Sequence, residues 1–377
     1  MPATAVTDET PGHGREPGGR RWLRRLGVLV VVLGVLAATV AAVPALRVRA
    51  VAAATSLDAL GVPVPRPFAA EVTTGQRTIA GVEGAWFDPG PDAPVVLLVP
   101  GAAPEGLDDP RIVRVAEALA RSKRAVFMPE LRVYQQDLVV DDVHDLADIT
   151  LELALERGPV LLVGASFGGS LGLLAAADPR LDGQLLGVAT FGSYVDLLGV
   201  VQAGTTGTAL VGDRAIAWDP HPLADQVIRD QLVDLLPAEF RAEVVEVLDG
   251  ERDPDTLPEP IRAAYELAMN DDPNRTRELA RQIPEELQRR LAEVSPVTVA
   301  DDIDTRVIAM HSTQDPAIPY AELLRLGDAI PHAELHTLDT FTHVDLALDT
   351  PRDWWDAGGD LRVVWTFVTE LLEAQRT

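Results

Sequence analysis

Residues 159–176 have the sequence PVLLVGASFGGSLGLLAA and give the strongest structural signal in the chain. The stretch begins with the apolar run Val160–Val163, which is typical of a buried strand, and ends with a run of Leu, Ala and Gly that is typical of a helix. Ser166 lies between them, with a glycine two positions away on either side. Because glycine has no Cβ, Gly164 and Gly168 allow the strand and the helix to approach closely at a sharp turn. The alternative is a glycine-rich turn whose serine only caps a helix.

The predicted turn places the Ser166 hydroxyl where negative charge is favoured. A helix that begins beneath the serine favours developing negative charge, and the backbone N–H of Phe167 can donate to an oxyanion. A second donor is expected in the loop after the apolar run Val95–Val99, where the chain continues as PGAAP over residues 100–104. We predict that this donor is the N–H of Ala102, unless the segment is an ordinary Pro/Gly turn.

A serine hydroxyl acts as a nucleophile when a base takes its proton and an acid orients that base. Of the seven histidines, His343 is the predicted base because it follows the last expected strand in a loop, and His311 is the second choice. Asp315 is the predicted acid, since it lies in the loop after another expected strand and precedes His343 by 28 residues. Asp339 and Asp345 are rival acids, each also explained as a surface carboxylate. The order Ser, Asp, His fits a parallel sheet of this kind.

From about residue 70 the chain alternates short apolar, β-branched runs with longer amphipathic segments. This pattern predicts an α/β fold in which helices flank a mostly parallel sheet, over a domain at residues 70–377. The expected strands are Gly84–Phe87, Val95–Val99, Ala125–Met128, Val160–Val163, Gly187–Phe191, Arg306–Met310 and Ala333–Thr337, with weak candidates in Glu71–Ile79 to complete eight. The expected helices are Asp109–Ser122, Leu138–Glu156, Phe167–Ala177 and Asp360–Ala374.

More than a hundred residues separate the strands that end at Phe191 and begin at Arg306, far more than one crossover helix requires. We predict an insertion at about residues 195–300 that forms a helical cap. Its Pro and Asp clusters separate four expected helices, at Leu223–Leu235, Ala238–Val247, Glu259–Met269 and Arg275–Glu293.

The N-terminal region contains Leu26–Leu46, a stretch of 21 residues without a charge. As a helix it is long enough to cross a hydrocarbon layer of about 30 Å, and it is longer than the usual apolar region of a signal peptide. Five arginines precede it and two follow it, which predicts a cytoplasmic N-terminus and an extracytoplasmic domain. A cleaved signal peptide and a buried soluble helix are the alternatives. Residues 1–25 are expected to be a disordered basic tail, and residues 47–69 a linker.

Composition excludes several classes of protein. The net charge is −26, and the residues after position 50 carry −30, so binding to nucleic acid is disfavoured. The chain has no cysteine, which excludes disulfides, thiolate metal sites and cysteine nucleophiles. The acidic run Asp141–Asp148 could suggest a metal site, but at helical spacing it is better explained as a solvated face. We therefore predict neither a metal nor a cofactor.

Taken together, the Gly164–Gly168 turn, the loop at Ala102, Asp315 and His343 resemble the α/β-hydrolase superfamily, in the same order along the chain. The resemblance implies a serine hydrolase that cleaves a carboxylic ester, with lipid esters among the candidates, through an acyl-enzyme. Many relatives carry His before the oxyanion glycine, whereas this chain has Pro100. An acyltransferase with the same residues, or an inactive binding protein with the same fold, remains open, as do thioester and amide substrates.

Overall fold

An eight-stranded sheet forms the core of the computed structural model, which describes residues 42–64, 69–102, 105–135, 140–220, 229, 232–233, 235–341 and 357–375. The strand order is β1-β2-β4-β3-β5-β6-β9-β10. β1 and β2 are antiparallel to their neighbours, and all later pairs are parallel. The strands are β1 (Thr73–Ile79), β2 (Val82–Asp88), β3 (Val95–Val99), β4 (Ala125–Pro129), β5 (Val160–Ala165), β6 (Leu185–Phe191), β9 (Val307–Ser312) and β10 (Glu334–Leu338).

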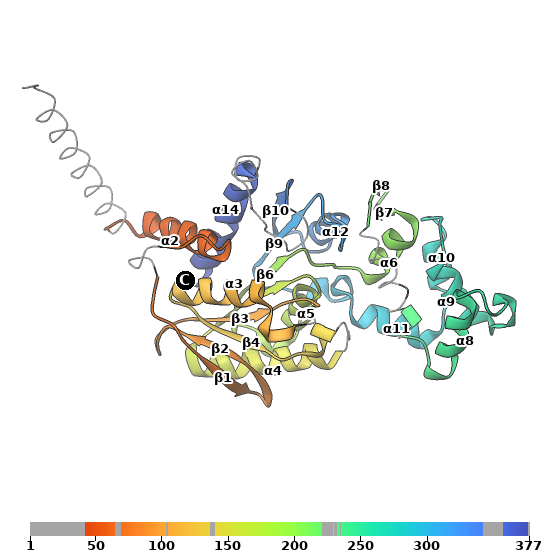
Figure 1. The fold of residues 1–377 in the computed structure, drawn as a ribbon, viewed down its shortest axis with the longest axis horizontal. Helices are drawn as coiled ribbons and strands as arrows, with labels where there is room; N and C mark the ends of the chain where they lie inside the picture. The colour runs from red at the N-terminus through yellow and green to blue at the C-terminus, as the bar shows by residue number, and fades with distance from the viewer. Residues whose placement is uncertain are drawn as a thin grey trace, which may run out of the picture. The chain divides into compact units, whose positions relative to one another are not determined.

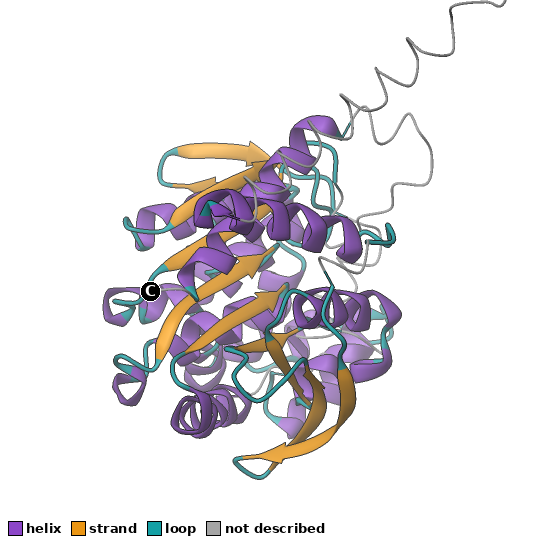
Figure 2. Ribbon diagram, turned by 90° about the vertical axis from the view of Figure 1, so that its left-hand side faces the viewer, coloured by secondary structure: helices purple, strands orange, loops and turns teal. Residues whose placement is uncertain are grey.

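Helices cover both faces of this sheet (Figures 1 and 2). One face packs against α3 (Pro110–Arg121) and α14 (Gly358–Ala374), and the other against α4 (Val140–Arg157), α5 (Phe167–Ala176) and α12 (Ala321–Ala329). Because β3 is buried along its whole length, it shows an apolar run without alternation. The predicted α/β fold with a mostly parallel, eight-stranded sheet is confirmed. Within Glu71–Ile79, the weak candidate region, the chain forms the remaining strand, β1.

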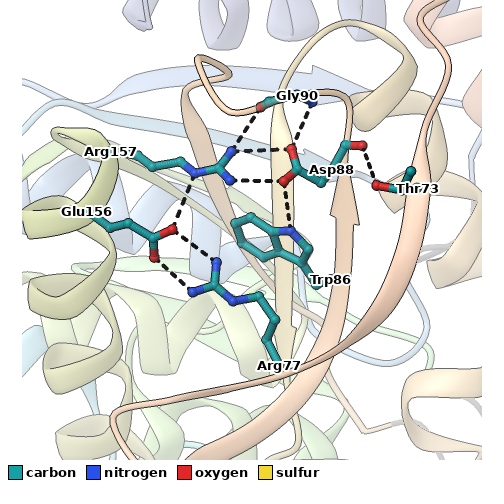
Figure 3. Close-up of polar contacts among 7 residues, drawn as sticks. All are labelled: Thr73, Arg77, Trp86, Asp88, Gly90, Glu156 and Arg157. Carbon is teal, nitrogen blue, oxygen red and sulfur yellow. Dashed lines mark hydrogen bonds and ion pairs between the residues drawn. The ribbon is translucent and has the colours of Figure 1, made fainter.

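The β1–β2 hairpin at one edge of the sheet is attached to α4 by a cluster of charged groups around Trp86 (Figure 3). The guanidinium carbons of Arg77 and Arg157 lie 4.6 and 5.0 Å from the centre of the Trp86 ring. Arg157 pairs with Asp88 at 2.9 Å, and Arg77 pairs with Glu156 at 2.9 Å. Hydrogen bonds from Arg157, Gly90 and Trp86 outweigh burial and hold the pKa of Asp88 below its usual value.

The insertion between β6 and β9 begins with α6 (Leu197–Thr206) and a two-stranded hairpin of β7 (Thr208–Val211) and β8 (Arg214–Ala217). The helices α8 (Ala238–Leu248), α9 (Glu259–Ala268), α10 (Thr276–Ala280) and α11 (Glu285–Glu293) follow, and Figure 1 shows them grouped beyond α6. Short 3-10 helices occur at Gly106–Asp108, Arg132–Gln135, Pro179–Leu181, Pro254–Thr256, Pro296–Thr298 and Ala300–Asp302.

Two predictions for the insertion were wrong. We expected only helices, but residues 208–217 form the β7–β8 hairpin, whose small and apolar residues pack against α12. We also expected one helix over Arg275–Glu293, but α10 ends at Ala280 and α11 begins at Glu285. Pro284 at the boundary explains the break, because proline disfavours the helical conformation of the residue before it. Most of the expected helix Leu223–Leu235 lies outside the described residues.

Helix α2 (Pro44–Ala59) occupies much of the segment that we expected to be a linker. The chain divides into two compact units, Met1–Ala50 and Val51–Thr377, and α2 runs across that boundary. Within the second unit, Asp58 pairs with Arg121 of α3 at 3.0 Å, which attaches the end of α2 to that helix. Among the residues that the structure describes, no helix has the length and apolar character to cross a membrane. Most of the predicted span, residues 26–41, falls outside that part of the chain.

Candidate active site

Ser166 lies at the turn between β5 and α5, in a strained backbone conformation. Its φ is 50° and its ψ is −130°, a region that residues other than glycine rarely adopt. Such a conformation costs on the order of 1–3 kcal/mol and persists only where surrounding structure enforces it. The Ser166 N–H donates to the carbonyl of Phe191 in the neighbouring strand at 2.8 Å, and the Gly169 N–H donates to the carbonyl of Ser166 at 3.1 Å. These two backbone hydrogen bonds therefore hold Ser166 in its strained conformation.

The glycines beside Ser166 are required by close backbone contacts. A Cβ on Gly164 would lie 2.4 Å from the Cα of Gly169, and a Cβ on Gly168 would lie 2.2 Å from the carbonyl oxygen of Val99. Real Cβ atoms do not approach other atoms this closely, so no other residue fits at either position without moving the backbone. The two glycines thus bring β5, α5 and the end of β3 together around Ser166.

The loop after β3 lies directly beside Ser166. A Cβ on Gly101 would be 2.5 Å from the Cβ of Ser166 and 3.0 Å from its hydroxyl oxygen. Ala102 follows Gly101 directly and belongs to the same loop. Phe167 is the first residue of α5, where an N–H has no acceptor within the helix. The two predicted oxyanion donors therefore come from segments that meet at Ser166.

Asp315 follows β9 and is almost fully buried, with 2% of its surface exposed. Its Oδ1 accepts hydrogen bonds from the N–H groups of Ala317 at 2.8 Å and Ile318 at 3.0 Å. Its backbone carbonyl accepts a bond from the indole N–H of Trp218, which follows the β7–β8 hairpin, at 2.8 Å. The carboxylate orientation is thus fixed by its own loop, and the loop is fixed by the insertion.

His311, the second choice for the base, supports the Asp315 loop instead. Its side chain is buried, and its Nε2 lies 3.0 Å from the carbonyl oxygen of Ile318 and 3.4 Å from Oδ2 of Asp315. The ring also packs edge-on against Tyr320, with the centroids 6.3 Å apart. We expected His311 to follow a strand, but β9 continues to Ser312 and therefore includes it.

His343, the predicted base, lies outside the described residues, as does the rival acid Asp345. Its assignment stays a prediction. The other rival, Asp339, has an exposed side chain and follows β10 directly. β10 is the neighbour of β9, so the chain that continues to His343 leaves the sheet next to the strand that carries Asp315.

The insertion joins the sheet through a buried acidic group that sequence reasoning missed. Glu322 of α12 accepts hydrogen bonds from the N–H groups of Val195 at 2.8 Å and Asp196 at 2.9 Å, and it pairs with Arg325. Burial raises the pKa of Glu322, although Arg325 opposes that rise. Arg325 also donates to the carbonyl of Leu210 in β7 at 2.7 Å. No sequence pattern could identify this contact, because its partners are more than a hundred residues apart.

Tyr194 is a second buried residue that the sequence did not single out. Its hydroxyl donates to the carbonyl of Val294 at 2.9 Å, and its ring packs edge-on against Phe167 with the centroids 5.6 Å apart. Burial raises the pKa of Tyr194 well above its usual value, so the hydroxyl stays protonated. Phe167, the residue after Ser166, thus packs on the first segment of the insertion.

The acidic run Asp141–Asp148 was interpreted as a solvated helix face, and this is wrong for one member. Asp142 is buried and accepts hydrogen bonds from the N–H of Val133 at 2.9 Å and of Arg132 at 3.4 Å. Asp141 and Asp148 pair with arginines at the surface. Within the described ranges, no group of three or more His, Asp or Glu side chains is arranged to hold a metal ion.

Comparisons with known proteins agree with this architecture. The model of the alpha/beta hydrolase family matches residues 96–357, which is more than half of the chain. The chain therefore belongs to the alpha/beta hydrolase family and is a hydrolase. No curated protein matched the sequence.

The solved structures that match the chain are distant from it in sequence. A hormone-sensitive lipase from a metagenome library is 14% identical, with 91% of this chain and 97% of that chain covered and a TM-score of 0.46. A meta-cleavage product hydrolase from Pseudomonas fluorescens is 18% identical, with 78% and 97% covered and a TM-score of 0.42. An acylaminoacyl peptidase from Pyrococcus horikoshii is 13% identical, with 81% and 42% covered and a TM-score of 0.46.

Proposed function

We propose that this hydrolase cleaves carboxylic esters through an acyl-enzyme on Ser166, with His343 as the base and Asp315 as the acid that orients it. The observation that carries the proposal is the geometry of Ser166. A non-glycine residue is held at a positive φ on a strand-to-helix turn, against the loop that contains Gly101. This geometry supports acyl transfer, because a hydroxyl on such a turn can be served by the first N–H of the helix and by an N–H of the loop after β3.

In the proposed reaction, the Ser166 oxygen attacks the ester carbonyl while His343 takes the hydroxyl proton. The N–H groups of Phe167 and Ala102 donate to the oxyanion of the tetrahedral intermediate. Collapse of the intermediate breaks the ester bond, and His343 returns the proton to the leaving alcohol. Water then attacks the acyl-enzyme by the same route, which releases the acid and restores the Ser166 hydroxyl.

The sheet supports a role for Asp315 in this mechanism. Strands β5 and β9 are separated by one strand, β6, so the ends that carry Ser166 and Asp315 are about 10 Å apart at the usual strand spacing. An imidazole with a hydrogen bond at each nitrogen can span a gap of that size between two side chains. The N–H groups of Ala317 and Ile318 fix Oδ1 of Asp315, so the carboxylate can orient such an imidazole without being reoriented itself.

A serine-directed fluorophosphonate probe tests the nucleophile. We expect the full-length protein to be labelled at Ser166 and to hydrolyse short p-nitrophenyl esters, and we expect Ser166→Ala to do neither. Labelling that persists in Ser166→Ala would remove this residue from the mechanism. A panel of esters that differ in acyl length would then define the substrate. If an added alcohol takes the acyl group faster than water does, so that ester forms faster than free acid, the result would favour the acyltransferase instead.

We also propose that residues 26–46 anchor the protein in the cell membrane by a single span, with the hydrolase domain outside the cytoplasm. The uncharged length of the segment and its flanking arginines support this. Leu33→Arg with Leu36→Arg in the full chain should move the protein to the soluble fraction, because each central arginine costs about 2.5–3.5 kcal/mol of insertion free energy. A wild-type protein that is already soluble would contradict the anchor. A domain that protease cannot reach on intact cells would contradict the orientation.

A further inference from the structure

Asp360, in the first turn of α14, gathers the backbone of the turn that follows β10. The carboxylate accepts hydrogen bonds from three consecutive N–H groups, those of Asp339 at 3.0 Å, Thr340 at 2.7 Å and Phe341 at 3.3 Å. It also accepts a bond from the hydroxyl of Thr340 at 2.6 Å. Only 4% of Asp360 is exposed, so no bulk water competes for these donors.

The same turn is tied to the loop of the proposed acid. The buried hydroxyl of Ser312 donates to the carbonyl of Phe341 and accepts a bond from the N–H of Gln314 at 3.1 Å. The N–H of Thr313 donates to the carbonyl of Leu338 at 2.8 Å. Phe341 itself is buried in the core between the sheet and α14. The turn at residues 339–341 is therefore fixed from two sides, by Asp360 and by the end of β9.

Phe341 precedes His343 by two residues. Two residues of fully extended chain span at most about 7 Å, so the position of Phe341 limits where the imidazole of His343 can lie. Asp360 also lies in the first turn of α14, so its carboxylate joins that helix to the last described residues before His343.

We propose that Asp360 is a positioning residue for the catalytic base: it fixes the turn at residues 339–341 and thereby sets the position of His343. The inference rests on the proposed function, because it assumes that His343 takes the proton from Ser166. In Asp360→Asn one acceptor oxygen becomes an NH2 donor and the charge is lost, so the amide cannot accept from all four donors and the turn moves to satisfy the rest. A shift of about 1 Å in a catalytic group can cost about 100-fold in rate.

The test compares Asp360→Asn with Asp142→Asn in the full-length protein. Asp142 is a matched control because it is also a buried carboxylate in the first turn of a helix, and it also accepts N–H groups of the preceding loop. We expect Asp360→Asn to lower kcat for a short ester about 10- to 100-fold, with KM within about threefold. Asp142→Asn should lower Tm by a similar amount while kcat stays within about twofold. Equal losses of kcat in both variants, or a wild-type kcat in Asp360→Asn, would overturn the proposal.

The second measurement places Asp360→Asn in a His343→Ala background. A residue that acts through His343 costs nothing further once that imidazole is gone, so the double variant should match His343→Ala within about twofold. A further loss as large as that in the wild-type background would show a merely structural role. If His343→Ala alone keeps the wild-type kcat, the assigned base is wrong and the proposed function fails before Asp360 is at issue.

A milder variant covers the case in which Asp360→Asn does not fold. Thr340→Val removes one donor to Asp360 from an exposed side chain and keeps the backbone N–H. We expect kcat to fall about two- to fivefold with KM unchanged, less than in Asp360→Asn because the carboxylate keeps its three backbone donors. An unchanged kcat in Thr340→Val would contradict the proposal.

Discussion

The turn at Ser166 and the loop at Asp315 end two strands of the same sheet, yet they are held in different ways. The Ser166 turn depends on close backbone packing, since the atoms around Gly164 and Gly168 leave no room for a Cβ. The Asp315 loop is shaped by polar contacts, which include a bond from Trp218 in the insertion. The proposed nucleophile thus depends on close backbone packing between β5, α5 and the end of β3, whereas the proposed acid depends on side chains far along the chain. The two regions should fail in different ways when they are mutated.

Among changes in the Asp315 loop, Asp315→Asn should give the largest loss of activity. The amide oxygen can still accept the N–H groups of Ala317 and Ile318, but the neutral group no longer stabilises a protonated imidazole. We expect kcat to fall about 10³- to 10⁴-fold with little change in Tm. The control is Asp339→Asn, which removes the rival carboxylate and keeps the backbone N–H. A larger loss in Asp339→Asn than in Asp315→Asn would reverse the assignment of the acid.

Gly168→Ala should disrupt the Ser166 turn and lower the stability of the folded protein, without removing a catalytic side chain. The new Cβ would lie 2.2 Å from the carbonyl oxygen of Val99, which is backbone and cannot rotate away. We expect a loss of about 3 kcal/mol or more in the free energy of unfolding, measured by urea denaturation. Gly75→Ala is the matched control, because a Cβ there has no heavy atom within 4 Å. Equal stability of the two variants would show that the close contacts at Ser166 are not required.

Trp218→Phe should loosen the Asp315 loop with a smaller effect. The change keeps an aromatic ring in the same place but removes the N–H that donates to the carbonyl of Asp315. We expect a loss of about 1 kcal/mol in stability and a decrease of a few-fold in kcat, since the carboxylate keeps its two backbone donors. Steady-state kinetics on the purified variant measure this. An unchanged kcat would mean that the insertion does not help to position the acid.

The β1–β2 edge of the sheet is the reference region for the Ser166 turn and the Asp315 loop. A substitution at this edge should leave kcat unchanged. Arg157→Gln removes the partner of Asp88 and should cost about 1 kcal/mol of stability. Because the pKa of Asp88 is lowered in the folded protein, this contribution is present above the usual value of 3.8 and is lost as the pH falls through the folded pKa. The difference in Tm between Arg157→Gln and wild type should therefore shrink between pH 5 and pH 3. A constant difference over that range would contradict the role of the ion pair.

The sequence specifies the Ser166 turn well because its determinants are local. A buried strand, two glycines and a helix occur within eighteen residues, and each shows its own pattern. The sheet is predictable for the same reason, since the buried strands are continuous apolar runs. The helices of the insertion were predicted less well, because the position of Pro284 divides a run whose hydrophobic pattern is continuous across the break.

The supports of the Asp315 loop and of the turn at residues 339–341 are not visible in the sequence. Trp218 contacts Asp315 across 97 residues, and Glu322 contacts Val195 across 127 residues. Asp360 looks like an ordinary acidic residue at the start of a helix until the fold brings it to Asp339. Almost every residue type has the same backbone N–H and carbonyl groups, so residue identity does not show which of them form hydrogen bonds. Only the tertiary structure reveals these bonds.

The central claim is that Ser166 and His343 act as one catalytic unit, and a double-mutant cycle tests it most directly. Rates of ester hydrolysis are compared for Ser166→Ala, His343→Ala and the double variant, each with its Tm as a control for folding. If the two residues act together, each single change should cost about 10³-fold or more in kcat, and the double variant should be no slower than Ser166→Ala. A wild-type rate in His343→Ala, or losses that multiply in the double variant, would contradict the account.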